Sequence, residues 1–99
     1  MDLSGILRDF KEKRILKEAL TLYNNILING NTIDGVNFSY TYVKREFKRE
    51  VLEKLNELVS LDNSTLSVKY VSVNFVPMYT FNIYVPVEDL TNNVKTLQN

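Results

Sequence analysis

The chain has 99 residues, 44% of them hydrophobic, and its twelve basic side chains balance twelve acidic ones. This length makes one domain, residues 1–99, and the zero net charge excludes a global attraction to nucleic acid or anionic lipid. The absence of cysteine and histidine excludes disulfides, thiolate metal sites and the commonest general base near neutral pH. No glycine-rich phosphate loop is present, so we expect a non-catalytic protein without cofactor or metal.

Residues 3 to 28 predict a helix, because good helix formers predominate and no proline interrupts them. The apolar stripe of this helix changes side. Apolar residues from Leu3 to Phe10 share one side, and those from Leu16 to Leu27 fall almost opposite. Either the helix breaks at the charged run Lys11 to Arg14, or one continuous helix packs its two ends against different surfaces, such as its own core and a second subunit.

A strand and a second helix follow the turn at Asp34-Gly35. Apolar side chains occupy every second position from Val36 to Tyr42, which is typical of a half-buried strand. From Lys44 the spacing lengthens, and the apolar residues up to Val59 form one face of a helix.

Residues Ser64 to Val87 predict a β-hairpin in which Lys69 is the only charge. A three-residue loop at Val76-Pro77-Met78 would place Phe75 opposite Tyr79 and gather apolar side chains on one face. We expect this register. Its other face would then carry tyrosine, serine, threonine and asparagine side chains.

The order helix, strand, helix, strand, strand, helix predicts an α+β fold with a three-stranded mixed sheet packed by helices. The hairpin covers about residues 65–85, and a short C-terminal helix is expected after Pro86. A right-handed crossover makes the first two strands parallel, and the third lies antiparallel between them. This arrangement resembles a fragment of the ferredoxin-like fold with an added N-terminal helix.

Two uncharged strand surfaces contain residue types that protein-binding sites use. The first strand would form a sheet edge without a charge from Val36 to Val43, although soluble proteins usually protect such edges. On the hairpin, tyrosine offers contact area, while serine and asparagine offer adaptable hydrogen bonds. An ordinary solvated sheet face is the alternative interpretation. The candidate interaction residues are Phe38, Tyr40, Tyr42, Tyr70, Ser72, Asn74, Asn82 and Tyr84.

Two basic clusters support a competing hypothesis, a nucleic-acid-binding regulator. Their side chains could contact phosphates along DNA, but neighbouring acidic residues favour a solvated helix face. Exposed aromatic residues on a sheet could also stack single-stranded RNA bases, although the hairpin supplies only Lys69 as a cation. The candidate nucleic-acid-binding residues are Arg8, Lys11, Arg14, Lys44, Arg45, Lys48 and Arg49.

The chain is rich in Asn, Ile, Lys, Tyr and Phe and lacks Cys, His and Trp, as expected for a product of an AT-rich genome. In composition and size, without a diagnostic motif, it resembles the small orphan proteins of filamentous or rod-shaped viruses of hyperthermophilic archaea. The resemblance implies a viral protein in the host-cell cytoplasm and transfers no functional residue. An AT-rich bacterium or its phage also fits this composition.

No apolar run approaches the roughly 18 residues of a membrane span, and the N-terminus lacks a signal-peptide core. We therefore expect a cytoplasmic protein that does not enter a membrane. The predicted function is that of a small protein-interaction module, a homodimer or the binder of another protein, that uses an uncharged aromatic strand surface.

Overall fold

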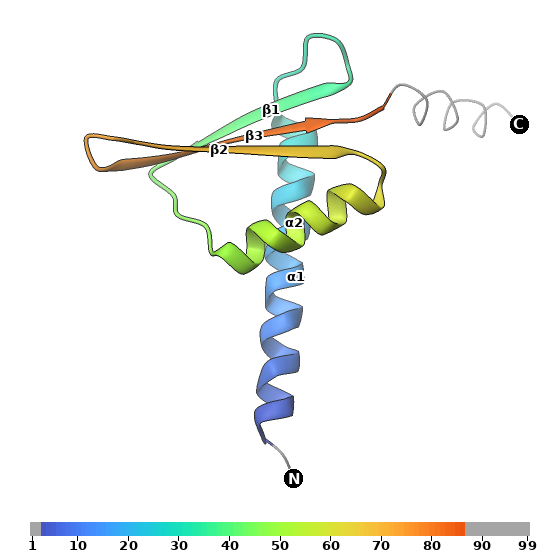
Figure 1. The fold of residues 1–99 in the computed structure, drawn as a ribbon, viewed down its shortest axis with the longest axis vertical. Coiled ribbons are helices and arrows are strands. Elements are labelled where there is room, and N and C mark those ends of the chain that lie inside the picture. Colours follow the sequence, from blue (N-terminus) through green and yellow to red (C-terminus); the bar gives the residue numbers. More distant parts are fainter. Residues whose placement is uncertain (1–2, 87–99) are drawn as a thin grey trace, which may run out of the picture.

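The computed structural model describes residues 3–86 and shows two helices on one face of a three-stranded sheet (Figure 1). The predicted α+β class is confirmed, and so is the element order through the hairpin. The predicted C-terminal helix lies outside the described residues. The elements are α1 Leu3–Asn29, β1 Asn37–Val43, α2 Arg49–Leu61, β2 Thr65–Val73 and β3 Val76–Tyr84.

Helix α1 is continuous over 27 residues, so the charged run does not break it. Its second half buries Ala19, Leu22 and Ile26 in the core. Its first half projects away from the sheet and beyond α2 (Figure 1). The apolar side chains on this projecting half, Leu7 and Phe10 among them, are exposed in the described part of the chain.

The strands lie in the order β1-β3-β2, with β3 in the centre as predicted. Both neighbouring pairs are antiparallel, so the two outer strands run in the same direction but do not touch. The sheet is therefore antiparallel rather than mixed. This order leaves β1 and β2 as its two edges.

The predicted hairpin register is wrong. The turn consists of Asn74 and Phe75, so that Val73 pairs with Val76 and Tyr70 pairs with Tyr79. Pro77 belongs to β3 instead of a loop. Proline lacks a backbone N–H, but no hydrogen bond between β1 and β3 is lost, because Pro77 lies opposite Lys44, just after β1 ends. The Pro77 carbonyl still accepts a hydrogen bond of 2.8 Å from the Lys44 N–H.

The observed register explains the apolar pattern without a bulge. Three side chains of β2 share the helix-facing side of the sheet with Tyr79, Phe81 and Ile83 of β3. The three, in order, are Leu66, Val68 and Tyr70. A loop one residue longer would have separated these two rows of apolar side chains.

The core lies between this sheet face and the helices. Phe81 and Ile83 are fully buried against Leu55 of α2 and Ile26 of α1. Aromatic rings close one end of the core, where the Phe47 ring centroid lies 5.3 Å from that of Phe81 in an edge-on contact. The core thus fixes how β2 and β3 lie over α2.

Candidate interaction surface

The aromatic side chains of β1 lie on the helix-facing side of the sheet. Phe38, Tyr40 and Tyr42 are half-buried and pack against the core. The Tyr42 ring centroid is 5.8 Å from that of Phe81, and the Asn25 side-chain amide donates to the Tyr42 hydroxyl. These three rings therefore form a margin of the core that is only partly open to solvent.

The edge of β1 is partly closed by the preceding loop. Asn31 and Ser39 exchange two backbone hydrogen bonds of 2.8 and 2.9 Å. The Asp34 carboxylate accepts hydrogen bonds from the Asn37 side-chain amide and from the backbone N–H groups of Asn37 and Val36. These bonds, led by the one from the Asn37 side chain, lower the pKa of Asp34 to about 2. The first half of this edge is therefore unavailable to another strand.

The residues predicted to form one hairpin face are divided between two. Tyr70 and Ser72 lie on the helix-facing side of β2, whereas Asn82 and Tyr84 lie on the outer side of β3. Asn74 is in the turn. The corrected register causes this division, since a change of turn length moves the side chains of one strand to the opposite face.

Among residues 3–86, the open edge of the sheet belongs to β2. The N–H of Val85 bonds to the carbonyl of Val36, and that of Lys44 to Pro77, so odd-numbered residues of β3 bond to β1. Even-numbered residues of β3 therefore bond to β2, where their partners are the odd-numbered residues of Thr65–Val73. The backbone groups of the remaining residues point away from the sheet. These residues are Leu66, Val68, Tyr70 and Ser72.

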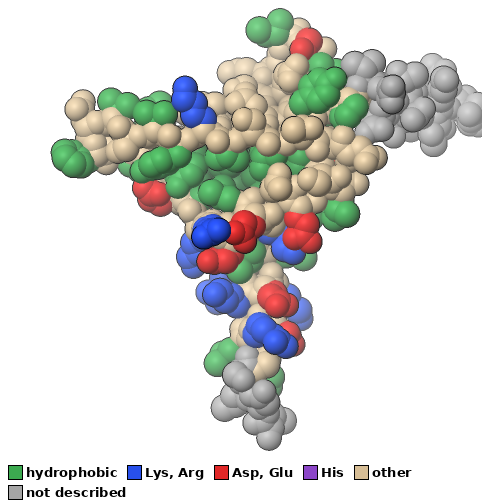
Figure 2. Space-filling view, in the orientation of Figure 1, with side chains coloured by type: hydrophobic (Ala, Val, Ile, Leu, Met, Phe, Trp, Pro, Cys, Tyr) green, Lys and Arg blue, Asp and Glu red, His purple; other side chains and the backbone are tan. Residues whose placement is uncertain are grey.

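Apolar side chains accompany this open backbone. Val68 is 37% exposed and Tyr70 is 52% exposed on the helix-facing side of β2. Figure 2 shows hydrophobic side chains gathered between the sheet and α2 and again toward the hairpin tip. Neither proline nor a second charge accompanies Lys69 in β2. A nine-residue edge strand of this kind pairs readily with another strand.

The predicted central position of β3 implies that β2 is the second edge, but the prediction names only β1 as an exposed edge. Which backbone groups of β2 point outward depends on the length of the turn. An Asn-Phe turn is not among the common two-residue hairpin sequences, so the sequence offered no signal for it.

The hairpin tip presents a strained aromatic residue. Phe75 is 99% exposed and has a φ of 66°, and Asn74 before it has a φ of 50°. Two-residue hairpins commonly place glycine at the second position, because bulky side chains avoid positive φ. Phe75 therefore combines local strain with a fully solvated ring.

The two basic clusters lie on different elements. Arg8, Lys11 and Arg14 are exposed on the projecting half of α1, and the others lie between β1 and the first turn of α2. Two of that second group have partners. The Arg45 guanidinium lies 4.8 Å from the Phe47 ring centroid, and Arg49 forms an ion pair of 2.9 Å with Glu53. Lys44 and Lys48 complete this group.

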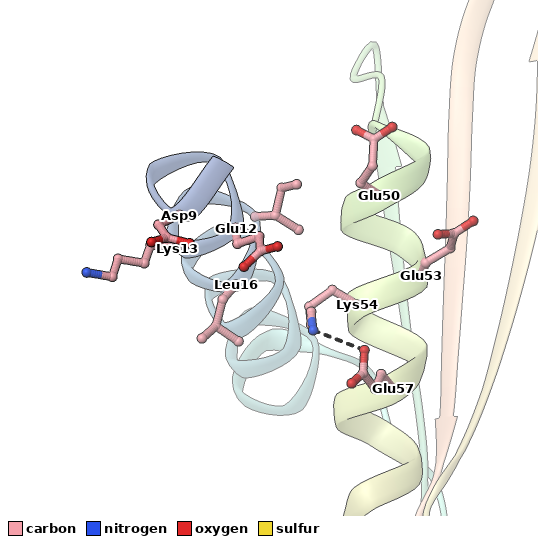
Figure 3. Close-up of a pocket in the computed structure, with 9 residues that line it drawn as sticks. Asp9, Glu12, Lys13, Leu16, Glu50, Glu53, Lys54 and Glu57 are labelled. Atoms are coloured by element: carbon pink, nitrogen blue, oxygen red, sulfur yellow. Dashed lines mark ion pairs between the residues drawn. The ribbon is translucent and has the colours of Figure 1, made fainter. Parts of the chain in front are cut away.

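An open acidic groove of about 580 Å³ separates α1 from α2 (Figure 3). Leu16 lines it from α1, and Lys54 points into it from α2, where it pairs with Glu57 at 3.0 Å. Lys13 extends away from α2. The carboxylates that line the groove are Asp9, Glu12, Glu50, Glu53 and Glu57. Negative charge thus gathers on the side of α2 that faces α1.

Within residues 3–86 no cluster of three or more acidic, histidine or cysteine side chains is suited to hold a metal ion. Neither helix in this range is long and apolar enough to cross a membrane. Comparisons with protein-family models, curated proteins and solved structures found no match to this chain.

Proposed function

We propose that this chain is a small non-catalytic protein-interaction module that self-associates through the open edge of β2. The observation that carries the proposal is the row of backbone groups on Leu66, Val68, Tyr70 and Ser72 that points away from the sheet. Outward N–H and C=O groups bind another strand by main-chain hydrogen bonds, which require no particular sequence. The loop paired with Ser39 makes the β1 edge less suited to this role.

Side chains and net charge support the same surface. Val68 and Tyr70 supply partly exposed apolar area beside the outward backbone, and tyrosine is enriched at protein interfaces. The formal net charge is zero, so two copies of the chain do not repel one another through their overall field. Self-association therefore requires no partner of opposite charge.

The experiment is a measurement of solution mass by light scattering after gel filtration, over a wide range of concentrations. The parent protein should approach twice the 11.5 kDa chain mass as concentration rises. The Val68→Pro variant should remain at the monomer mass. Proline is tolerated on an edge strand where the lost N–H pointed to solvent, but it removes a donor that strand pairing needs.

Thr41→Pro is the matched control, because the Thr41 N–H points outward from the opposite edge of the same sheet. This variant should keep the doubled mass. A parent protein that stays at 11.5 kDa throughout contradicts self-association. A Val68→Pro variant that keeps the doubled mass contradicts the use of the β2 edge.

The competing hypothesis of a nucleic-acid-binding regulator has weaker support. Arg49 is already paired with Glu53, and Arg45 lies against Tyr42 and Phe47. Phosphate binding would give a strongly salt-dependent shift of a DNA or RNA probe. Loss of such a shift in the Arg45→Ala variant would favour this hypothesis instead.

A further inference from the structure

Taking self-association through β2 as its basis, we infer that the partner is a second copy whose β2 pairs antiparallel about a two-fold axis at Val68. The two sheets then join into one sheet of order β1-β3-β2-β2-β3-β1. Such a contact uses the same surface twice and closes as a dimer, so no edge of β2 is left open for further growth.

The backbone limits the registers that are available. In an antiparallel pair, residues directly opposite each other are either both hydrogen-bonded or both not. Only even-numbered residues of β2 have outward backbone groups, so even must face even and odd must face odd. Symmetric pairing must therefore centre on a single residue. The centres that keep a long overlap are Val68, Lys69 and Tyr70.

The side chains distinguish these three centres. A centre at Lys69 places two ammonium groups directly opposite one another in a pair that lacks backbone hydrogen bonds, where side chains are closest. A centre at Tyr70 sets Val68 against Ser72 and Lys69 against Val71. Each of those two pairs joins an apolar side chain to a polar one. The centres at Lys69 and at Tyr70 are therefore both unfavourable.

A centre at Val68 gives one mixed pair, Thr65 opposite Val71 at the ends of the overlap, whereas a centre at Tyr70 gives three. Val68 faces its own copy, and Leu66 faces Tyr70 on the helix-facing side of the sheet. On the outer side Lys69 faces Ser67, so no charge meets a like charge or an apolar side chain. Residues 65–71 of each copy pair along their whole length.

The position of α2 agrees with this centre. Helix α2 lies beneath the part of β2 that is nearer to Thr65, and the hairpin tip extends beyond it (Figure 1). Its 13 residues are about 20 Å long, similar to the length of about 23 Å that residues 65–71 span in an extended strand. Pairing centred on Val68 therefore brings the two α2 helices side by side beneath the seam, the line where the two β2 strands pair.

The side of α2 that meets its copy in this arrangement carries no net charge. Glu50, Lys54 and Glu57 line the groove toward α1, so the opposite side of the helix faces the seam. That side carries Leu52, Asn56 and Ser60, which are four positions apart, and beside them Arg49, whose charge is balanced by its ion pair with Glu53. Two copies of this surface therefore meet without repulsion between net charges.

The absence of cysteine gives a direct test. Val68→Cys introduces one thiol per chain, and at the proposed axis the two Cα atoms are about 5.5 Å apart, within the range of a disulfide. Mild oxidation of the folded protein should link most of it into covalent dimers on a non-reducing gel. Tyr70→Cys is the control, because its copies would lie about 13 Å apart along the strands. It should link far less.

The outcomes separate this inference from the proposed function. A parent protein that is monomeric at every concentration overturns both. Suppose instead that Val68→Pro abolishes the dimer, but Tyr70→Cys forms the disulfide and Val68→Cys does not. That result overturns the proposed register and leaves the β2 interface supported. A mixture of Leu66→Cys and Tyr70→Cys chains should also link, and failure of that mixture overturns the register. Circular dichroism identifies any variant that does not fold.

Discussion

The Tyr23 hydroxyl of α1 donates a hydrogen bond of 2.7 Å to the Asp62 carboxylate at the end of α2. This bond ties the second half of α1 to the turn that leads into β2. It thereby helps to hold α2 beneath the strand edge proposed for self-association.

Replacing Tyr23 by phenylalanine should lower the free energy of unfolding by about 1–2 kcal/mol, because it removes a hydrogen bond to a charged acceptor from a buried position. Urea unfolding measures this change. Tyr84→Phe is the control, since the Tyr84 ring is partly exposed on the outer face, and its stability should match the parent within about 0.5 kcal/mol. Equal losses in the two variants would contradict a role for the Asp62 contact.

The same contact predicts a dependence on high pH. Burial raises the pKa of Tyr23 above its ordinary value, and the hydrogen bond to Asp62 raises it further. Because the unfolded chain loses this proton first, stability is full below about pH 10 and falls as pH rises above that value. The fall should be shallower in Tyr23→Phe than in the parent. Unfolding curves at several pH values between 9 and 12 measure the difference, and identical slopes would contradict this assignment.

Phe75→Gly should stabilise the hairpin. Relief of positive φ at a bulky residue should raise the free energy of unfolding by about 1–2 kcal/mol. The greater freedom of glycine in the unfolded chain lowers it by about 0.5–1 kcal/mol. We expect a net gain of about 0.5–1 kcal/mol in thermal or urea unfolding. Phe75→Ala removes the exposed ring but keeps a Cβ at positive φ, so it should not reproduce this gain. Equal stability of the two variants would exclude strain as the cause.

Gly30→Ala should destabilise the protein by more than about 1 kcal/mol, because no compatible position exists for a side chain there. An added Cβ would collide with the backbone carbonyl of Ile26 and lie 3.3 Å from that of Ser39. The Asn31–Ser39 bridge that covers the β1 edge depends on this approach. Gly5→Ala is the matched control, since no atom lies within 4 Å of its Cβ position in α1. That change should stabilise the helix by about 0.5–1 kcal/mol.

Periodicity was sufficient for the elements and their order. Alternation from Val36 to Tyr42 and helical spacing up to Val59 each reflect which side chains meet the core, and both were confirmed. The same periodicity could not decide whether α1 breaks, because a change of apolar side occurs equally at a break and along a continuous helix. The final strand order followed from the right-handed crossover and the tight hairpin.

The hairpin register could not be obtained in the same way. Proline usually marks a turn, but the strand position of Pro77 depends on where the neighbouring β1 ends, which is a tertiary property. A turn with Phe75 at positive φ also contradicts local preference. The predicted register placed Tyr70 and Ser72 on the same face as Asn82 and Tyr84, whereas the observed register separates them. The predicted surface was therefore incorrectly assembled although its strands were correct.

Helix α1 is one element by its backbone hydrogen bonds but two by its surroundings. Residues 6–14 are exposed, whereas the core holds Ala19 to Ile26. A helical segment of this length without tertiary support is marginal in water, so its amide hydrogens should exchange far sooner than those of the second half. Any molecule that covers Ile6, Leu7 and Phe10 would slow that exchange. The amide exchange rate of the projecting half of α1 therefore reports whether a molecule is bound there.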